Sequence, residues 1–202
     1  MRRATAATML ALLAAATAPA TAAAAGPSPY RHSLLQVDGA LRAAIEEAPV
    51  AVGEGLLSSE VVCNLAEAAE GRGSTEEAAA DWSTLGQLVE RVDAPALARL
   101  DRTLVRADTL LASLGRTFTK AWKGSAADVR RLRFGVSRAR AGVKGLRRAH
   151  GRIAESLPAW AERRCETAVT AVEAGLGRVP GAVEQVNVGM GWLWALAERK
   201  GG

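Results

Sequence analysis

Aromatic residues and histidines are scarce in this chain of 202 residues. Phe, Trp and Tyr make up 4% of the sequence, and there are only two histidines and two cysteines. Strands favour aromatic and β-branched side chains, so this scarcity argues against a β-sheet fold and for an all-α protein. His32 and His150 lie far along the chain from both cysteines, which excludes the ligand spacing of a zinc site. We expect no metal and no cofactor.

Motifs for catalysis are also missing. The sequence has no Gly-x-Ser-x-Gly, no Walker loop and no His-Glu-x-x-His. His150 falls on the apolar seam of a predicted helix, where it is better explained as a polar seam residue than as a base. Carboxylate pairs such as Glu46–Glu47 are expected on helix surfaces. The sequence therefore predicts a protein that is not an enzyme.

Long hydrophobic runs are absent beyond the first residues of the chain. Arg2 and Arg3 precede the short apolar run 9–16, and small residues with an Ala-x-Ala pattern follow through Ala25. This order is typical of a secretory signal peptide, here residues 1–25. The alternative is a membrane anchor, but the run is shorter than the roughly 20 residues that span a bilayer. We expect a secreted or cell-surface protein whose residues 26–202 form a single α-helical domain.

The two cysteines, Cys63 and Cys165, form an even pair. An oxidising compartment would favour joining them in a disulfide. The alternative is two buried free thiols.

Helix signals are interrupted several times in the first half of the chain. A helix is predicted from Ser33 to just before Pro49, because proline disrupts a helix interior. Gly53 and Gly55 predict a loop, and a short helix follows from Ser58 or Ser59. Asp93 is interpreted as the N-cap of the next helix, with a proline in its first turn.

The strongest pattern is a pair of heptad runs. Apolar residues occupy every a and d position of the first run, and only His150 interrupts the second. The first run is Leu97, Leu100, Leu104, Ala107, Leu111, Leu114 and Phe118, and the second is Val129, Leu132, Val136, Ala139, Val143, Leu146, His150, Ile153 and Leu157.

A turn is predicted where the two runs change register. Gly124 can end one helix, and Ser125 can cap the next. We therefore expect an elongated helical bundle around an antiparallel coiled-coil hairpin, residues 94–157. The alternative is one bent helix with a stutter.

Charge is unevenly distributed along the chain, whose overall net charge is +5. Residues 38–101 carry thirteen acids and four arginines, a net charge of −9, whereas residues 102–164 carry sixteen bases and four acids, a net charge of +12. Most of these bases lie on the second heptad run. They form a candidate face for an acidic ligand: Arg130, Arg131, Arg133, Arg138, Arg140, Lys144, Arg147, Arg148 and Arg152.

Three interpretations of this charge compete. The acidic helices can pack along the basic ones and neutralise them, which we favour. The basic face can instead bind an acidic glycan or an anionic lipid surface. Nucleic acid is the least favoured ligand, since no aromatic residues alternate with the arginines to stack on bases. Trp192 and Trp194 have two interpretations as well, a membrane-interface anchor or, preferred here, a core cap or partner contact.

Several features together resemble the N-terminal region of trypanosome variant surface glycoproteins. They are the signal peptide, the alanine-rich chain, the long helical hairpin and the string Val62-Cys63-Asn64-Leu65-Ala66-Glu67 on an early helix. The resemblance implies a helical rod that dimerises in a dense surface coat, with an early cysteine bonded to one far downstream. It lies in architecture more than in sequence, because the family's further cysteines and Asn-x-Ser/Thr acceptors are not found in these residues. An unrelated secreted protein of a GC-rich bacterium would share the same composition.

The sequence thus predicts a non-catalytic secreted or cell-surface helical protein, a coat component, antigen or structural protein. Its expected partner is a second copy or another helical protein. The alternative is an exported binding module that uses the basic face for an acidic glycan or anionic lipid.

Overall fold

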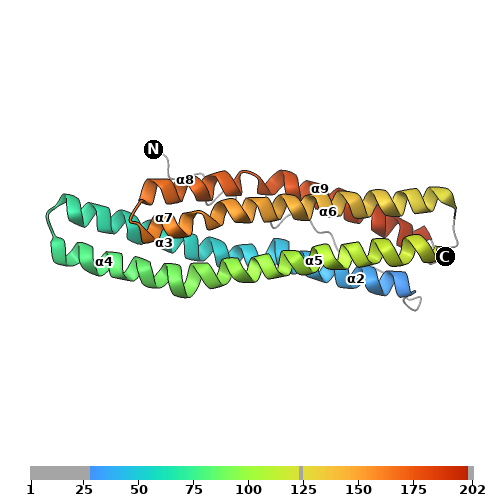
Figure 1. Ribbon diagram of the computed structural model, residues 1–202, viewed down its shortest axis with the longest axis horizontal. Helices are drawn as coiled ribbons and strands as arrows, with labels where there is room; N and C mark the ends of the chain where they lie inside the picture. The colour runs from blue at the N-terminus through green and yellow to red at the C-terminus, as the bar shows by residue number, and fades with distance from the viewer. Residues whose placement is uncertain (1–27, 123–124, 200–202) are drawn as a thin grey trace. The chain divides into compact units, whose positions relative to one another are not determined.

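The computed structural model describes residues 28–122 and 125–199, with the side chains of residues 46–51 left aside. Every regular element in these residues is helical, which confirms the all-α prediction. The elements, shown in Figure 1, are α2 (Pro29–Arg42), η1 (Ala43–Glu47), α3 (Ala48–Gly71), α4 (Thr75–Leu88), η2 (Val89–Asp93), α5 (Ala94–Ala121), α6 (Ala126–Ala154), α7 (Ser156–Ala161), α8 (Cys165–Leu176) and α9 (Val179–Arg199). The segments η1 and η2 are π-helical. The predicted signal peptide, residues 1–25, lies outside the described residues.

The contacts divide the chain into two compact units. Unit 1 comprises Met1–Glu47, Thr103–Lys144 and Pro180–Gly202, and unit 2 comprises Ala48–Arg102 and Gly145–Val179. The helices α5 and α6 therefore contribute residues to both units. The single domain expected over residues 26–202 stays a prediction.

The predicted heptad seams are buried. From Leu97 to Leu114 every seam residue of α5 is at most 8% exposed, and Phe118 is half-buried. On α6 the seam residues from Leu132 to Leu146 are buried, as is Ile153. A buried stripe with this spacing is what an amphipathic helix presents to its neighbours, so the periodicity identified the core faces correctly.

Segments of α5 and α6 face each other within each unit. In unit 1, Arg140 binds Asp108, and Val136 Cγ1 lies 3.1 Å from the place a Gly115 Cβ would occupy. In unit 2, His150 Nε2 donates a hydrogen bond of 2.8 Å to Leu97 O. The continuous hairpin over residues 94–157 stays a prediction, because Lys123 and Gly124 lie outside the described residues. The second run is not one helix to Leu157, since α6 ends at Ala154.

The first helix of unit 1 begins earlier than predicted. Ser28 Oγ accepts a hydrogen bond of 3.3 Å from Arg31 N, and Pro29 occupies the first turn, where its missing N–H costs nothing. This start brings Tyr30 into the core, where its hydroxyl donates a hydrogen bond of 2.9 Å to Leu193 O of α9. The Tyr30 ring meets Phe118 edge-on at a centroid distance of 5.0 Å. Burial raises the pKa of Tyr30 well above its ordinary value.

The loop predicted at Gly53 and Gly55 is wrong. The backbone is helical without interruption from Pro29 to Gly71, and the π-helical segment η1 lies just before Pro49. A wider π turn relieves the loss of a helical hydrogen bond at a proline. Gly55 has a packing role instead, because a Cβ at this position would fall on Asp93 Oδ1.

The interpretation of Asp93 as the N-cap of the next helix is also wrong. The chain passes from η2 into α5 without a break, and Asp93 is 1% exposed. Ser59 Oγ donates a hydrogen bond of 2.6 Å to Asp93 Oδ2, while Oδ1 has no hydrogen-bond partner among the described residues. A buried carboxyl with one unsatisfied oxygen replaces the expected helix start.

Unit 2 also contains the disulfide. Figure 1 shows α3 and α4 side by side, joined at residues 72–74. Cys63 of α3 is bonded to Cys165 at the first residue of α8, with their Cα atoms 5.9 Å apart. Both cysteines are buried. The predicted pairing is confirmed.

Candidate functional site

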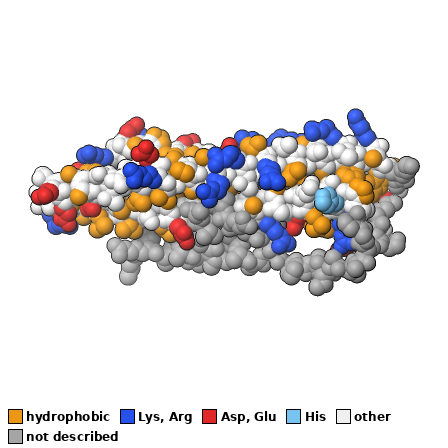
Figure 2. Space-filling model, turned by 90° about the horizontal axis from the view of Figure 1, so that it is seen from below, with side chains coloured by type: hydrophobic (Ala, Val, Ile, Leu, Met, Phe, Trp, Pro, Cys, Tyr) orange, Lys and Arg blue, Asp and Glu red, His pale blue; other side chains and the backbone are white. Residues whose placement is uncertain are grey.

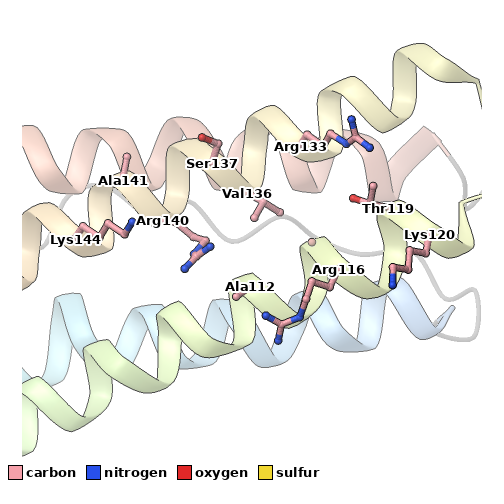
Figure 3. Close-up of a pocket in the computed structure, with 11 residues that line it drawn as sticks. Ala112, Arg116, Thr119, Lys120, Arg133, Val136, Ser137, Arg140, Ala141 and Lys144 are labelled. Carbon is pink, nitrogen blue, oxygen red and sulfur yellow. The ribbon is translucent and has the colours of Figure 1, made fainter.

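The candidate site is a groove between α5 and α6 in unit 1, with a volume of about 600 Å³. Its polar lining is dominated by cations: Arg116 and Lys120 from α5, and Arg133, Arg140 and Lys144 from α6. Figure 3 shows Arg140 reaching from α6 toward α5, with Lys144 one turn further along α6. Small residues such as Ala112, Gly115 and Ala141 lie between these side chains and leave the groove open.

One of the five cations is held in place by an acid. Arg140 Nε and Nη2 donate hydrogen bonds of 2.7 and 3.0 Å to the two carboxylate oxygens of Asp108. This two-pronged geometry matches the planar guanidinium and fixes its orientation. The hydrogen bond to Asp108 raises the pKa of Arg140 above its ordinary value, which desolvation partly opposes. Arg140 is therefore a structural cation of the groove.

The other four cations make no ion pair with any side chain that the structure describes. Arg116, Lys120, Arg133 and Lys144 are exposed, and each lines the groove. Positive charges that share one groove repel each other, so an anion that bridges them would relieve this repulsion. The groove is thus suited to a ligand with several negative charges.

The nine residues of the predicted basic face do not behave as one surface of free cations. Six of them, residues 130–144, belong to unit 1, and three, residues 147–152, belong to unit 2. Four make ion pairs, in the order Arg131–Asp128, Arg140–Asp108, Arg147–Asp101 and Arg152–Glu155. Figure 2 views the molecule from below and labels no single residue; on the described part of that side, Lys and Arg side chains are scattered among hydrophobic and uncharged atoms.

Three of the nine residues line the groove, namely Arg133, Arg140 and Lys144. Arg116 and Lys120 of α5 were not predicted, because they lie on the first heptad run and the predicted basic face comprises residues of the second. Their spacing of four residues, which places two cations on one helix face, was the available signal.

The charge of the whole chain is divided between the two units. From residue 28 onward, unit 1 contains fourteen Lys and Arg against seven Asp and Glu, a net charge of +7. Unit 2 contains ten Lys and Arg against fourteen Asp and Glu, a net charge of −4. Within unit 1 alone, basic residues outnumber acidic residues by seven, and neutralisation of the basic residues by the acidic helices stays a prediction.

The described residues contain no group of three or more His, Cys, Asp or Glu side chains able to hold a metal ion. His150 is engaged with Leu97 O in the seam of unit 2, and His32 Nε2 lies 3.2 Å from Gln36 Nε2 on the exposed side of α2. No helix in residues 28–122 or 125–199 is both long and apolar enough to cross a bilayer.

Comparison with known proteins adds no relative. The chain has no significant match to a protein-family model, to a curated protein or to a solved structure. The resemblance to variant surface glycoproteins therefore stays a prediction from the sequence, and the function has to be argued from unit 1 and unit 2 themselves.

Proposed function

We propose that the chain is an exported, non-catalytic binding protein whose groove in unit 1 takes up a polyanionic ligand. The observation that carries this proposal is the convergence on one groove of four cations, Arg116, Lys120, Arg133 and Lys144, that make no ion pair within the described part of the chain. The unit that contains this groove has a net charge of +7. Several cations on neighbouring helices suit a ligand with several negative charges, such as a sulfated glycan or a layer of anionic lipid head groups.

The salt dependence of binding tests the proposal. Neutralising several anionic groups with Lys and Arg releases counterions, so affinity for heparin or anionic vesicles is expected to fall steeply between about 50 and 200 mM salt. The groove variant Arg116→Gln/Arg133→Gln/Lys144→Gln is expected to bind at least about tenfold more weakly.

A matched control separates the groove from net charge. The variant Arg91→Gln/Arg102→Gln/Arg178→Gln removes three exposed cations of unit 2 and lowers the net charge equally. It is expected to bind as the unaltered chain does. Equal losses in both triple variants, or no binding of any polyanion at low salt, would contradict the proposal.

The opposite charges of the two units support a second candidate, a structural protein that assembles with copies of itself. Unit 1 of one molecule would attract unit 2 of the next, as a coat component requires. Light scattering at tens of micromolar should then detect assemblies at low salt that dissociate as salt screens the attraction. A monomer under all of these conditions would remove this candidate.

A further inference from the structure

An aromatic pair is exposed on unit 1. Phe134 of α6 is 46% exposed and Trp192 of α9 is 40% exposed, and their ring centroids are 5.6 Å apart in a T-shaped arrangement. Val188, one turn before Trp192 on α9, is 42% exposed. Two aromatic rings and a valine together leave more apolar surface in water than isolated exposed side chains do, and such patches mark interaction sites.

The close approach of α6 and α9 holds the pair in place. A Cβ at Gly189 of α9 would fall among Ala139 N and Gly135 O, which are backbone atoms of α6. Only glycine allows the two helices to come this near. Phe134 and Trp192 are therefore presented by two helices packed backbone to backbone, which fixes their positions.

A cation lies beside the aromatic pair. The Arg138 guanidinium lies 6.0 Å from the centre of the Phe134 ring. With 3.6 residues per turn, successive residues lie about 100° apart, so Phe134 and Arg138 lie about that far round α6 from Arg133 and Ser137, which line the groove. All four side chains are exposed, so the aromatic pair and the groove lining occupy neighbouring sides of the exposed part of α6.

We infer that this face of unit 1 docks on an anionic lipid bilayer, with Phe134 and Trp192 entering the interface and the groove cations meeting the head groups. The inference rests on the proposed function and narrows its ligand. Tryptophan favours the boundary between head groups and acyl chains, and Lys and Arg beside it are attracted to anionic lipids. A soluble polyanion would occupy the cations and leave the aromatic carbon atoms in water.

Vesicle sedimentation tests the role of the pair. The probes are phosphatidylcholine vesicles with and without one-third phosphatidylglycerol, and heparin as a soluble polyanion. The variant Phe134→Ser/Trp192→Ser is expected to bind anionic vesicles about tenfold more weakly and to bind heparin unchanged. Both side chains are exposed, so circular dichroism and thermal unfolding should match those of the unaltered chain.

Two further measurements complete the experiment: a control for the loss of exposed apolar surface, made in unit 2, and a probe of how deeply tryptophan enters the bilayer. Val61 and Leu65 of α3 are 56% and 52% exposed, so Val61→Ser/Leu65→Ser removes similar apolar surface and should bind vesicles unchanged. Lipids brominated along the acyl chain should quench tryptophan fluorescence of the bound protein. The quenching should be smaller in Trp192→Phe, which keeps an aromatic ring.

The outcomes separate the inference from the proposed function. Undiminished vesicle binding by Phe134→Ser/Trp192→Ser would overturn the inference, while salt-dependent binding lost in the groove variant would still support a polyanion-binding groove. Binding to heparin but not to anionic vesicles would also overturn the inference, because the ligand of the groove would then be a glycan and not a lipid bilayer. A third outcome is a dimer that forms without vesicles and that Phe134→Ser/Trp192→Ser prevents. It would show that the aromatic pair contacts a second copy of the chain, and it would also overturn the inference. Failure to bind either probe would end the proposed function itself.

Discussion

Ser59 on α3 and Asp93 on η2, thirty-four residues apart, share a buried hydrogen bond of 2.6 Å in unit 2. Asp93 is 1% exposed and Ser59 is 0% exposed, so the pair sits in the core. Burial raises the pKa of the Asp93 carboxyl above its ordinary value, and the Ser59 hydrogen bond partly opposes that rise. A raised pKa in the folded state means that the folded protein binds this proton more tightly than the unfolded chain.

Asp93 should therefore make stability depend on pH in a definite direction. Its favourable contribution is fully present below the pKa of the unfolded chain, about 3.9, and is lost as pH rises through the folded pKa. We expect Asp93→Asn to remove this dependence. Relative to the Asn variant, the unaltered protein should lose about 1–3 kcal/mol of unfolding free energy between acidic and neutral pH. Urea unfolding of both proteins across this pH range measures the difference. The prediction would be contradicted if the unfolding free energies of the two proteins changed with pH in parallel.

Gly55 should be intolerant of any side chain. Gly55→Ala places a Cβ on Asp93 Oδ1, so we expect a loss of about 1–3 kcal/mol in the free energy of unfolding. Gly86 of α4 is the matched control, because a Cβ there meets nothing within 4 Å. Gly86→Ala should stabilise the protein by about 0.5–1 kcal/mol through backbone entropy. Two changes of the same sign would argue against the close packing of η2 on α3.

Gly189 provides the corresponding test in unit 1. Gly189→Ala should force α9 away from α6 and destabilise the protein by about 1–3 kcal/mol, since the atoms in the way belong to the backbone. Gly191 lies on the open side of α9, and Gly191→Ala should be neutral or slightly stabilising. Thermal unfolding of the two variants makes the comparison. A Gly189→Ala protein as stable as the original would show that α6 and α9 are not packed this closely.

The Cys63–Cys165 bond should contribute strongly to stability. It closes a segment with a sequence separation of 102 residues, for which the loss of chain entropy in the unfolded state corresponds to about 4–5 kcal/mol. Cys63→Ser/Cys165→Ser should lose about this amount in urea unfolding, and added reductant should then have no further effect. Mass measurement that found two free thiols in the purified, unreduced protein would remove the basis of this prediction.

The Tyr30 hydroxyl anchors the beginning of α2 to α9. Tyr30→Phe keeps the ring between its aromatic neighbours and deletes only the hydrogen bond to Leu193 O, so we expect a loss of about 1 kcal/mol. Ser33→Ala, a half-buried position on the same helix without a described side-chain hydrogen bond, is the control. Equal thermal stability of Tyr30→Phe and the unaltered protein would contradict the anchor.

Periodicity and residue type alone determined much of this protein. The heptad spacing from Leu97 to Leu114 marked the buried side of α5, because helix geometry dictates which residues share a face whatever packs against it. The scarcity of aromatic and β-branched residues indicated an all-α fold. The number of cysteines predicted the disulfide without any knowledge of the fold, since the chain contains only one pair to join.

Other features depended on which elements meet. Asp93 has the local sequence of a helix cap, and Gly55 has that of a loop, but the packing of η2 on α3 buries one against the other. Local propensity is a small energy that tertiary contacts override. The groove cations and the Phe134–Trp192 pair combine residues from helices distant in sequence, and periodicity does not reveal which helix lies opposite. The net charge of each unit has the same origin, because the packing of the elements decides which acidic and basic residues belong to unit 1 and which to unit 2.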